Sequence, residues 1–180
     1  TMTFEPTIIV IFGGAGDLTI RKLAPALYNL MRDGFFPGQC EIIGVGRREM
    51  DNEAFRNILR EGLDRFSRRG KGDDQLWSDF AARLSYVSED VSSPTSGSLL
   101  TQRLLEVEKA WGARANRIFY LAIPPAMMEP AAATLQRIGV CRDCKRDRLV
   151  VEKPFGRDIT SAHDLNHLLS GMFVESQIYR

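Results

Sequence analysis

The sequence predicts an α/β fold, in which a doubly wound and mostly parallel β-sheet carries helices on both faces. Three observations lead to this prediction. Strand-like apolar runs alternate five times with amphipathic, helix-like stretches. The first run, TIIVIF at 7–12, has the β-branched character of a strand that is covered on both faces. The glycine-rich turn that follows it, GGAGDL at 13–18, stands where such sheets bind their ligands.

Length and composition fit one domain, or one domain and the start of another. The chain has 180 residues, of which 44% are hydrophobic, and this is enough for one core. Its net charge of +1 predicts neither nucleic acid nor an anionic membrane as the main partner. It has no apolar run near the ~18 residues of a membrane span and no signal-like segment. The three cysteines, Cys40, Cys141 and Cys144, then indicate a reducing cytoplasm.

Five strands are expected, at residues 7–12, 40–46, 85–91, 117–125 and 148–154. The first helix is expected to run from a cap at Asp17 to Met31 and to stop at Gly34. Pro25 lacks a backbone N–H, so it should kink this helix or mark where it restarts. The apolar side of the helix holds four leucines, Leu18, Leu23, Leu27 and Leu30.

The remaining helices lie between and after the later strands. One begins near Asp51 and places five apolar residues at helical spacing, namely Phe55, Ile58, Leu59, Leu63 and Phe66. Others are expected at residues 74–84, 98–112, 127–138 and 158–173. No internal repeat or low-complexity linker interrupts the alternation. The pattern therefore predicts one Rossmann-like domain over residues 1–180.

The glycine-rich turn predicts a nucleotide site. Gly13, Gly14 and Gly16 would let the backbone approach a pyrophosphate at the N-terminus of the first helix. The spacing is not a full GxGxxG, because Leu18 stands where the third glycine would be, and no GK[ST] follows to make a P-loop. A tight turn without a ligand is the alternative. The position between a buried strand and a helix favours nucleotide binding.

The end of the second strand indicates which nucleotide binds. NAD sites use an acidic residue here for the ribose hydroxyls, whereas a 2′-phosphate requires cations. This sequence reads GVGRRE, with Arg47 and Arg48 at the exit of the strand. A guanidinium group binds phosphate through two parallel hydrogen bonds, so NADP is the expected cofactor. The alternative is a pair of solvated loop arginines.

Four segments together resemble the amino-terminal half of the glucose-6-phosphate dehydrogenases. They are GGAGDLTIRKLAPALYNL (13–30), IIGVGRRE (42–49), IFYLAIPP (118–125) and VVEKPFGRD (150–158), and they occur in the order of the family. The resemblance implies that residues 1–180 are the dinucleotide-binding domain of a longer protein. The α+β substrate and dimerisation domain, which carries the histidine general base and follows an IDHYLGKE signature, is absent from this sequence. No catalytic residue is then expected in this chain, and the chain alone is expected to be inactive.

The resemblance also implies roles for individual residues. The pyrophosphate of NADP would lie on the turn made of Gly13, Gly14, Ala15, Gly16, Asp17 and Leu18. Arg47 would hold the 2′-phosphate, and Asp90, Val91 and Tyr120 would flank adenosine and ribose. Lys153 would reach both the nicotinamide end and the substrate, and Lys22 would add positive charge near the substrate. Ala15 departs from the Ser or Thr common in relatives, which would remove one hydroxyl contact to phosphate.

The reaction that the resemblance implies is the NADP-dependent oxidation of glucose 6-phosphate to 6-phosphogluconolactone, the first oxidative step of the pentose phosphate pathway. C1 of the sugar gives a hydride to NADP while a base takes the hydroxyl proton. The full-length enzyme is expected to be a homo-oligomer, a dimer or a tetramer.

Two further features are interpreted as structural. His163 and His167 lie four residues apart in HDLNHLL, which favours a solvated helix face over a catalytic or metal-binding role. The CRDC segment at 141–144 has no second CxxC and no nearby histidine, so its thiols are expected to be inert. No metal site is therefore expected.

Two other functions stay open from the sequence. Sugar and inositol oxidoreductases that carry EKP would also use Lys153, but they usually have a complete GxGxxG. A non-catalytic NADP-sensing module would account for the missing base. The ending at FVESQIYR, with no capping tail, argues against such a module.

Overall fold

The structure, a computed structural model, describes residues 5–66, 73–140, 146–151 and 178–179. In chain order the elements are β1 (Thr7–Phe12), η1 (Thr19–Leu23), α1 (Ala24–Arg32), β2 (Cys40–Gly46), α2 (Asn52–Phe66), α3 (Asp74–Ala81), β3 (Leu84–Ser88), α4 (Ser98–Trp111), β4 (Asn116–Leu121), η2 (Pro125–Met127), α5 (Met128–Arg137), β5 (Asp147–Val151) and β6 (Ile178–Tyr179). The strands predicted at 7–12 and 40–46 are confirmed to the residue. The predicted helix at 158–173 lies outside the described residues.

The strands form one sheet in the order β3-β2-β1-β4-β5-β6, and every recorded pairing is parallel. β1 lies in the middle, and the chain builds the sheet first on one side of it and then on the other. Phe12, at the end of β1, is level with Val45 in β2 and Leu121 in β4. The predicted doubly wound, mostly parallel sheet is confirmed, and its topological switch point lies between β1 and β4. The short strand β6 was not predicted.

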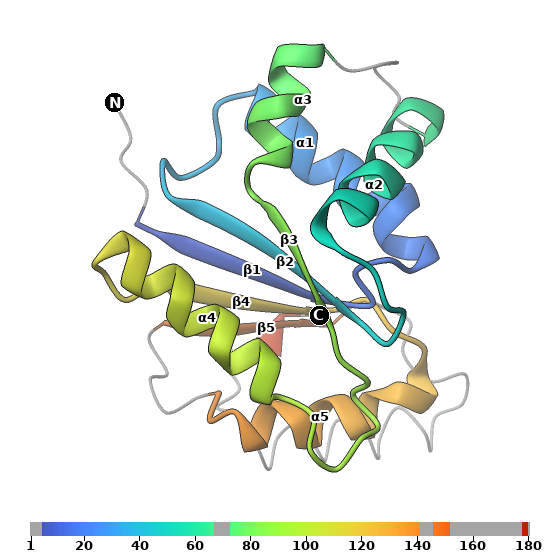
Figure 1. The fold of residues 1–180 in the computed structure, drawn as a ribbon, viewed down its shortest axis with the longest axis vertical. Helices are drawn as coiled ribbons and strands as arrows, with labels where there is room; N and C mark the ends of the chain where they lie inside the picture. Colours follow the sequence, from blue (N-terminus) through green and yellow to red (C-terminus); the bar gives the residue numbers. More distant parts are fainter. Residues whose placement is uncertain (1–4, 67–72, 141–145, 152–177, 180) are drawn as a thin grey trace.

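Helices cover both faces of the sheet, as Figure 1 shows: α1, α2 and α3 on one face, α4 and α5 on the other. The side chains of β1 alternate between the two cores, as the period of a strand requires. Ile8, Val10 and Phe12 pack in the core beneath α4 and α5, whereas Ile11 packs in the core beneath α1, α2 and α3. No helix among the described residues is both long and apolar enough to cross a membrane.

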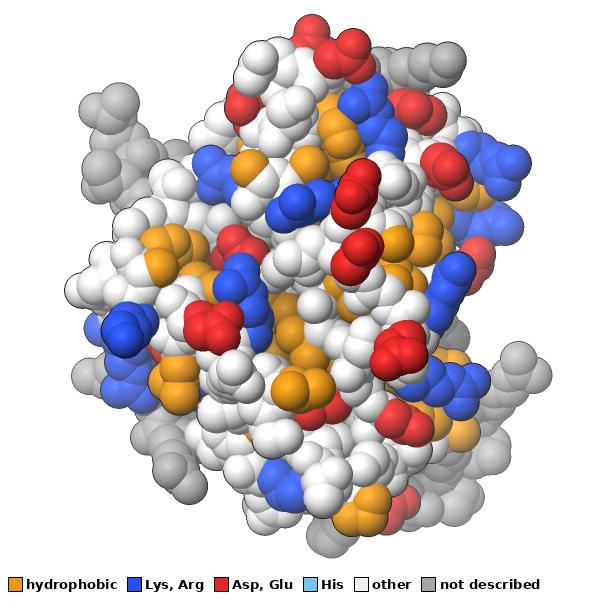
Figure 2. All heavy atoms as spheres, in the orientation of Figure 1, with side chains coloured by type: hydrophobic (Ala, Val, Ile, Leu, Met, Phe, Trp, Pro, Cys, Tyr) orange, Lys and Arg blue, Asp and Glu red, His pale blue; other side chains and the backbone are white. Residues whose placement is uncertain are grey.

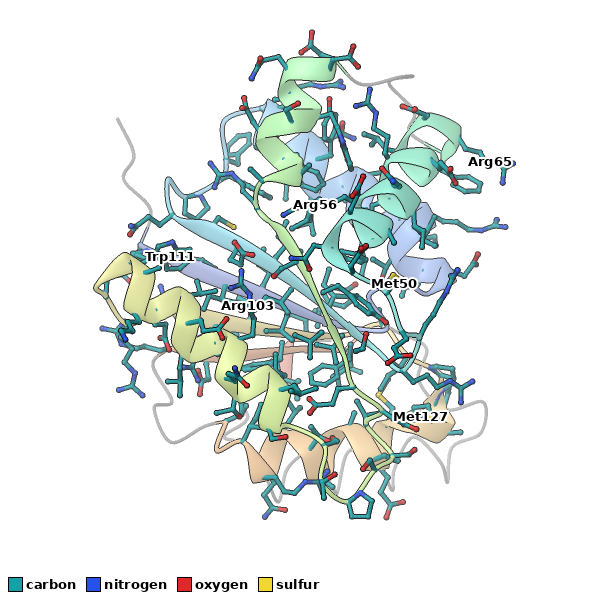
Figure 3. All side chains as sticks on the ribbon, in the orientation of Figure 1. Met50, Arg56, Arg65, Arg103, Trp111 and Met127 are labelled. Atoms are coloured by element: carbon teal, nitrogen blue, oxygen red, sulfur yellow. The ribbon has the colours of Figure 1, made fainter. Side chains whose placement is uncertain are left out.

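Two arginines attach the helical layers to β3, which is the edge strand of the sheet. Arg56 of α2 donates to the carbonyl oxygen of Leu84 from Nη2 at 2.8 Å and from Nε at 3.1 Å. Arg103 of α4 donates to Ser85 Oγ at 3.2 Å and forms an ion pair with Glu41 at 2.9 Å. Figure 3 shows the two arginines on the two sides of this strand. Side chains from both helical layers thereby bond to groups of the edge strand.

The first helix starts differently from its prediction. Its first hydrogen bond runs from the Ile20 N–H to the Gly16 carbonyl oxygen, at 3.1 Å. The carboxylate of Asp17 does not cap the helix, because it accepts a hydrogen bond from Arg21 Nε at 2.7 Å, one turn further on. The predicted cap at Asp17 is therefore wrong. The predicted restart at Pro25 is confirmed, since a π-helical turn, η1, precedes it and α1 begins at Ala24.

This helix stops at Gly34, and one of its four predicted core leucines is exposed. Gly34 has a φ of 82°, and its N–H donates to the Met31 carbonyl oxygen at 3.1 Å, while the Phe35 N–H donates to the Leu30 carbonyl oxygen at 2.9 Å. This is a Schellman motif, so Gly34 stops the helix as predicted. Leu30 is 45% exposed, so it does not share the buried side of the helix that was expected for it. The other three predicted residues, Leu18, Leu23 and Leu27, are partly buried against the core beneath α1, α2 and α3, in which Ala24 and Tyr28 are buried.

The later elements follow their predictions with shifted ends. The Asp51 carboxylate accepts a hydrogen bond from the Ala54 N–H at 2.8 Å and so caps α2, whose residues Phe55, Leu59 and Leu63 are buried. β3 ends at Ser88 rather than at residue 91. β4 ends at Leu121, before the two prolines. Of the strand predicted at 148–154, residues 152–154 lie outside the described part.

Candidate dinucleotide-binding site

The carboxyl ends of β1, β2 and β4 meet at the glycine-rich turn. The N–H groups of Gly13 and Gly14 both donate to the Val45 carbonyl oxygen in β2, at 2.9 and 3.1 Å. On the other side, the Ala122 N–H after β4 donates to the Phe12 carbonyl oxygen at 2.9 Å. The turn is therefore fixed at the switch point of the sheet, where doubly wound folds bind ligands.

Close packing between the strand ends requires the first two glycines. Gly13 has a φ of +84°, and a Cβ there would lie 2.2 Å from the Ala122 carbonyl oxygen. A Cβ on Gly14 would lie 2.5 Å from the Gly44 Cα in β2. The predicted tight turn is therefore present. The turn also brings the N-terminus of the following helix to the edge of the sheet.

The first turn of the helix after the glycine-rich turn has backbone N–H groups without a helical acceptor. The N–H groups of Asp17 and Leu18 precede the bond from Ile20 to Gly16, so the helix itself offers them no acceptor. The helix dipole adds a partial positive charge at the same end. Lys22, one turn along, is exposed. Backbone amides with a positive dipole can bind an anion such as a phosphate.

Thr19 is a residue of this site that the sequence analysis missed. Its hydroxyl donates to the Gly13 carbonyl oxygen at 2.8 Å, and the Gly16 N–H donates to the same oxygen at 2.9 Å. The side chain of Thr19 is fully buried, at 0% exposure. A threonine in the first turn of a helix is a known type of donor to nearby backbone carbonyls, which was the signal available in the sequence.

Arg47 follows the last residue of β2, next to the turn in the sheet, and its side chain is exposed. The carbonyl oxygen of Arg48 accepts hydrogen bonds from Tyr86 Oη at 2.7 Å and Ser88 Oγ at 3.2 Å, both from β3. Neither Tyr86 nor Ser88 was identified from the sequence. These two hydrogen bonds fix the backbone next to Arg47. Arg47 therefore follows the carboxyl end of β2 in a fixed position, at the same edge of the sheet as the glycine-rich turn.

Asp90 lies just after β3 and is exposed. Its Oδ1 accepts hydrogen bonds from the Ser92 N–H at 2.9 Å and from Ser92 Oγ at 2.6 Å. These two hydrogen bonds, together with the positive charge of Arg47, lower the pKa of Asp90 below its ordinary value. The carboxylate is therefore charged at neutral pH, and its main partner is Ser92.

Val91 and Tyr120 are partly buried. The Val91 carbonyl oxygen accepts a hydrogen bond from Thr134 Oγ1 at 3.2 Å, so α5 fixes the chain after β3. Tyr120 lies level with Ile11 of β1 and packs against the core beneath α1, α2 and α3. Tyr120 is the last residue but one of β4, and Val91 follows the carboxyl end of β3, so both lie toward the edge that carries the glycine-rich turn.

Several predicted residues lie outside the described part of the chain, namely Lys153, His163, His167, Cys141 and Cys144. Within the described ranges, no group of three or more His, Cys, Asp or Glu could hold a metal ion. In Figure 2, basic and acidic side chains are mixed over the described residues of the visible face. At the carboxyl edge of the sheet, the donors described above are backbone amides and a guanidinium group. Both types of donor bind phosphate esters.

Known proteins share the sequence of this chain over nearly its whole length. Residues 10–180 match the family model of the glucose-6-phosphate dehydrogenase NAD binding domain. The glucose-6-phosphate 1-dehydrogenase of Mycolicibacterium smegmatis is 38% identical over 98% of this chain, and that of Chlamydia pneumoniae is 35% identical over 98%. The chain spans 35% of the length of each of these relatives.

A solved structure gives the same result for the fold. A glucose-6-phosphate dehydrogenase in complex with its substrate glucose-6-phosphate superimposes with a TM-score of 0.87 and 31% sequence identity. This chain is covered completely, and 37% of the solved chain is covered. The family model, the relatives and the fold all point the same way, and this chain therefore belongs to the family of the glucose-6-phosphate dehydrogenase NAD binding domain.

Proposed function

We propose that this chain binds NADP and forms the cofactor-binding part of an enzyme that oxidises glucose 6-phosphate to 6-phosphogluconolactone. One observation carries the proposal: the glycine-rich turn is fixed between β1, β2 and β4, in front of a helix N-terminus and beside an arginine at the end of β2. The substrate-bound relative, with a TM-score of 0.87, supports the choice of substrate.

The turn is proposed to bind the pyrophosphate. The amide groups of Asp17 and Leu18 face no helical acceptor, so they can donate to phosphate oxygens. Gly13 and Gly14 shape the turn, and their own amides are already bonded to Val45. The negative charge of Asp17 is offset by its ion pair with Arg21 at 2.7 Å, which reduces its repulsion of an anionic ligand.

The 2′-phosphate is proposed to lie on Arg47, which makes NADP rather than NAD the cofactor. An exposed guanidinium can form two parallel charge-assisted hydrogen bonds to a phosphate. The two residues directly after the end of β2 are Arg47 and Arg48, and the acidic Glu49 comes only after them. Asp90, Val91 and Tyr120 are proposed to contact the adenosine and ribose.

NADP, when bound, supplies the hydride acceptor of this reaction. The contribution of the chain is to orient the dinucleotide and to place positive charge near the sugar phosphate, through Lys22 and Lys153. Neither lysine is proposed as the base. The base is proposed to be a histidine outside residues 1–180, so these residues alone are expected to bind NADP without turnover. The full-length enzyme is proposed to be a cytoplasmic dimer or tetramer.

The test is turnover by the full-length protein, followed as NADPH absorbance. Glucose 6-phosphate with NADP should give rapid reduction, and glucose or inositol should give little. Rapid reduction with an unphosphorylated sugar or inositol, and none with glucose 6-phosphate, would favour the other oxidoreductase class. NADP binding without turnover on any sugar would favour a sensing module.

A further inference from the structure

The loop of residues 47–51, here called the β2–α2 loop, is attached to β3 on both sides of Arg47. On one side, the Gly46 carbonyl oxygen accepts a hydrogen bond from the Glu89 N–H at 2.8 Å. On the other side, the Arg48 carbonyl oxygen accepts one from Tyr86 Oη at 2.7 Å. The backbone of Arg47 is therefore fixed at both of its neighbours, while its side chain is exposed.

Ser88 adds a second link between β3 and the loop. Its Oγ donates to the Arg48 carbonyl oxygen at 3.2 Å and accepts a hydrogen bond from the Met50 N–H at 3.3 Å. The Arg48 carbonyl thus has two donors, which is its full acceptor capacity. Met50 is seen in Figure 3 beside the start of α2, between that helix and the ends of the strands.

The position of the Tyr86 hydroxyl is itself closely determined. The Tyr86 side chain is 9% exposed, and its ring lies 5.1 Å from the ring of Phe55, between centroids. The Tyr86 N–H donates to Asn52 Oδ1 at 2.9 Å. A Cβ on Gly46 would lie only 2.7 Å from Tyr86 Oη, so a side chain at 46 would displace the hydroxyl. Burial raises the pKa of Tyr86, so the hydroxyl remains a donor at neutral pH.

We propose that Tyr86 and Ser88 are positioning residues for cofactor selectivity, because they fix the Arg48 carbonyl and thereby hold Arg47 where it can reach the 2′-phosphate. The proposal rests on the role given to Arg47 above. A loop that is ordered before the ligand arrives does not lose conformational freedom on binding, so its contact is stronger. Releasing the loop should therefore weaken the contact to the 2′-phosphate more than any other contact of the dinucleotide.

The test compares ligands that differ only in the 2′-phosphate. Calorimetry on the full-length protein measures the Kd of NADP against NAD, and of adenosine 2′,5′-bisphosphate against 5′-AMP. Tyr86→Phe and Ser88→Ala each remove one hydrogen bond to Arg48 and keep the size of the side chain nearly unchanged. Each variant should raise the Kd of the ligands that carry the 2′-phosphate, NADP and adenosine 2′,5′-bisphosphate, by about 3- to 10-fold. The Kd of NAD and of 5′-AMP, which lack this phosphate, should rise less than about 2-fold.

The matched control is Tyr28→Phe. Tyr28 is also a buried tyrosine beneath the same helices, but its hydroxyl has no hydrogen-bond partner among the described residues. This variant should leave all four Kd values unchanged. Melting temperatures of all variants, measured without ligand, identify any variant that has failed to fold.

A double-mutant cycle separates positioning from general stability. In the Arg47→Ala background, Tyr86→Phe should no longer change the Kd of NADP, because the contact that it supports is gone. Equal losses for NADP and NAD in Tyr86→Phe, or the same loss with and without Arg47, would overturn the proposal. If Arg47→Ala itself leaves NADP affinity unchanged, the role of Arg47 is wrong. If Arg47→Ala weakens NADP but Tyr86→Phe and Ser88→Ala do not, only the positioning role is wrong.

Discussion

The hydroxyl of Thr19 donates a hydrogen bond to the carbonyl oxygen of Gly13 across 2.8 Å, from the helix back to the first residue of the glycine-rich turn. The same oxygen accepts the Gly16 N–H at 2.9 Å. Two donors on one carbonyl fix the orientation of the peptide that links Gly13 to Gly14. The turn and the helix N-terminus are therefore held as one unit.

Replacing Thr19 with valine should weaken this unit. Thr19→Val keeps the shape of the side chain but loses the donor, which should cost about 1 kcal/mol of unfolding free energy. The affinity for NADP should fall about fivefold, because the amides of the helix N-terminus move with the turn. Chemical denaturation and calorimetry measure the two effects.

The control for this prediction is Thr19→Ser, which keeps the hydroxyl and loses one methyl group. Its NADP affinity should stay close to that of the wild type, even though its stability falls slightly. If the serine and valine variants bind NADP equally well, the hydrogen bond to Gly13 does not contribute to the binding site.

Arg47→Ala should lower the affinity for NADP by about 1.5 to 3 kcal/mol, because a charge-assisted contact to the 2′-phosphate is lost. The affinity for NAD should barely change. Arg48→Ala is the matched control, since Arg48 is also an exposed arginine of this loop and its carbonyl, which accepts from Tyr86, is kept. A similar loss of affinity for both cofactors would contradict the prediction.

Gly13→Ala should destabilise the protein by about 2 kcal/mol or more. A Cβ at this position would lie 2.2 Å from the Ala122 carbonyl oxygen, and the φ of +84° disfavours any side chain. Thermal unfolding measures the loss. Gly38→Ala is the control, because a Cβ there meets nothing within 4 Å. A wild-type melting temperature for Gly13→Ala would mean that β4 does not pack against the turn as described.

Cys40 should make stability depend on pH in the alkaline range. The thiol is 4% exposed, and its burial raises its pKa from 9.0 to about 11, although the charge of Arg83 opposes this. In the unfolded chain the thiol ionises near its ordinary pKa, so between about pH 9 and 11 the unfolded state loses a proton that the folded state keeps. The stability that this thiol contributes is complete below about pH 9 and is lost toward about pH 11.

The measurement is urea denaturation at about pH 8 and about pH 10.5 for the wild type and for Cys40→Ala. The wild type should lose about 2 kcal/mol more than the variant between the two pH values. The variant retains Cys141, Cys144 and every tyrosine and lysine, so their titration cancels in the comparison. Equal losses in both proteins would show that Cys40 ionises normally in the folded state.

The sequence by itself determined the local features of this protein. The strands at 7–12 and 40–46, the stop at Gly34, the helix start near Asp51 and the restart before Pro25 agree with the structure. Each depends on a run of neighbouring residues, through side-chain period, glycine conformation or the missing proline N–H. The alternation of these elements was also enough to predict a parallel sheet, because parallel strands need crossover helices between them.

The tertiary structure alone decided which polar side chains hold the site. Asp17 was expected to cap a helix, but its carboxylate pairs with Arg21. Tyr86 was read only as part of a strand, but its hydroxyl reaches the carbonyl of Arg48, 38 residues earlier in the chain. The sequence contains many carbonyl and side-chain oxygens that could accept a hydrogen bond from a given donor. Only the order and register of the strands bring one of these acceptors within hydrogen-bond distance. For that reason the sequence could place Arg47 at a strand end, whereas the contacts that hold its loop became visible only when β2 and β3 were paired.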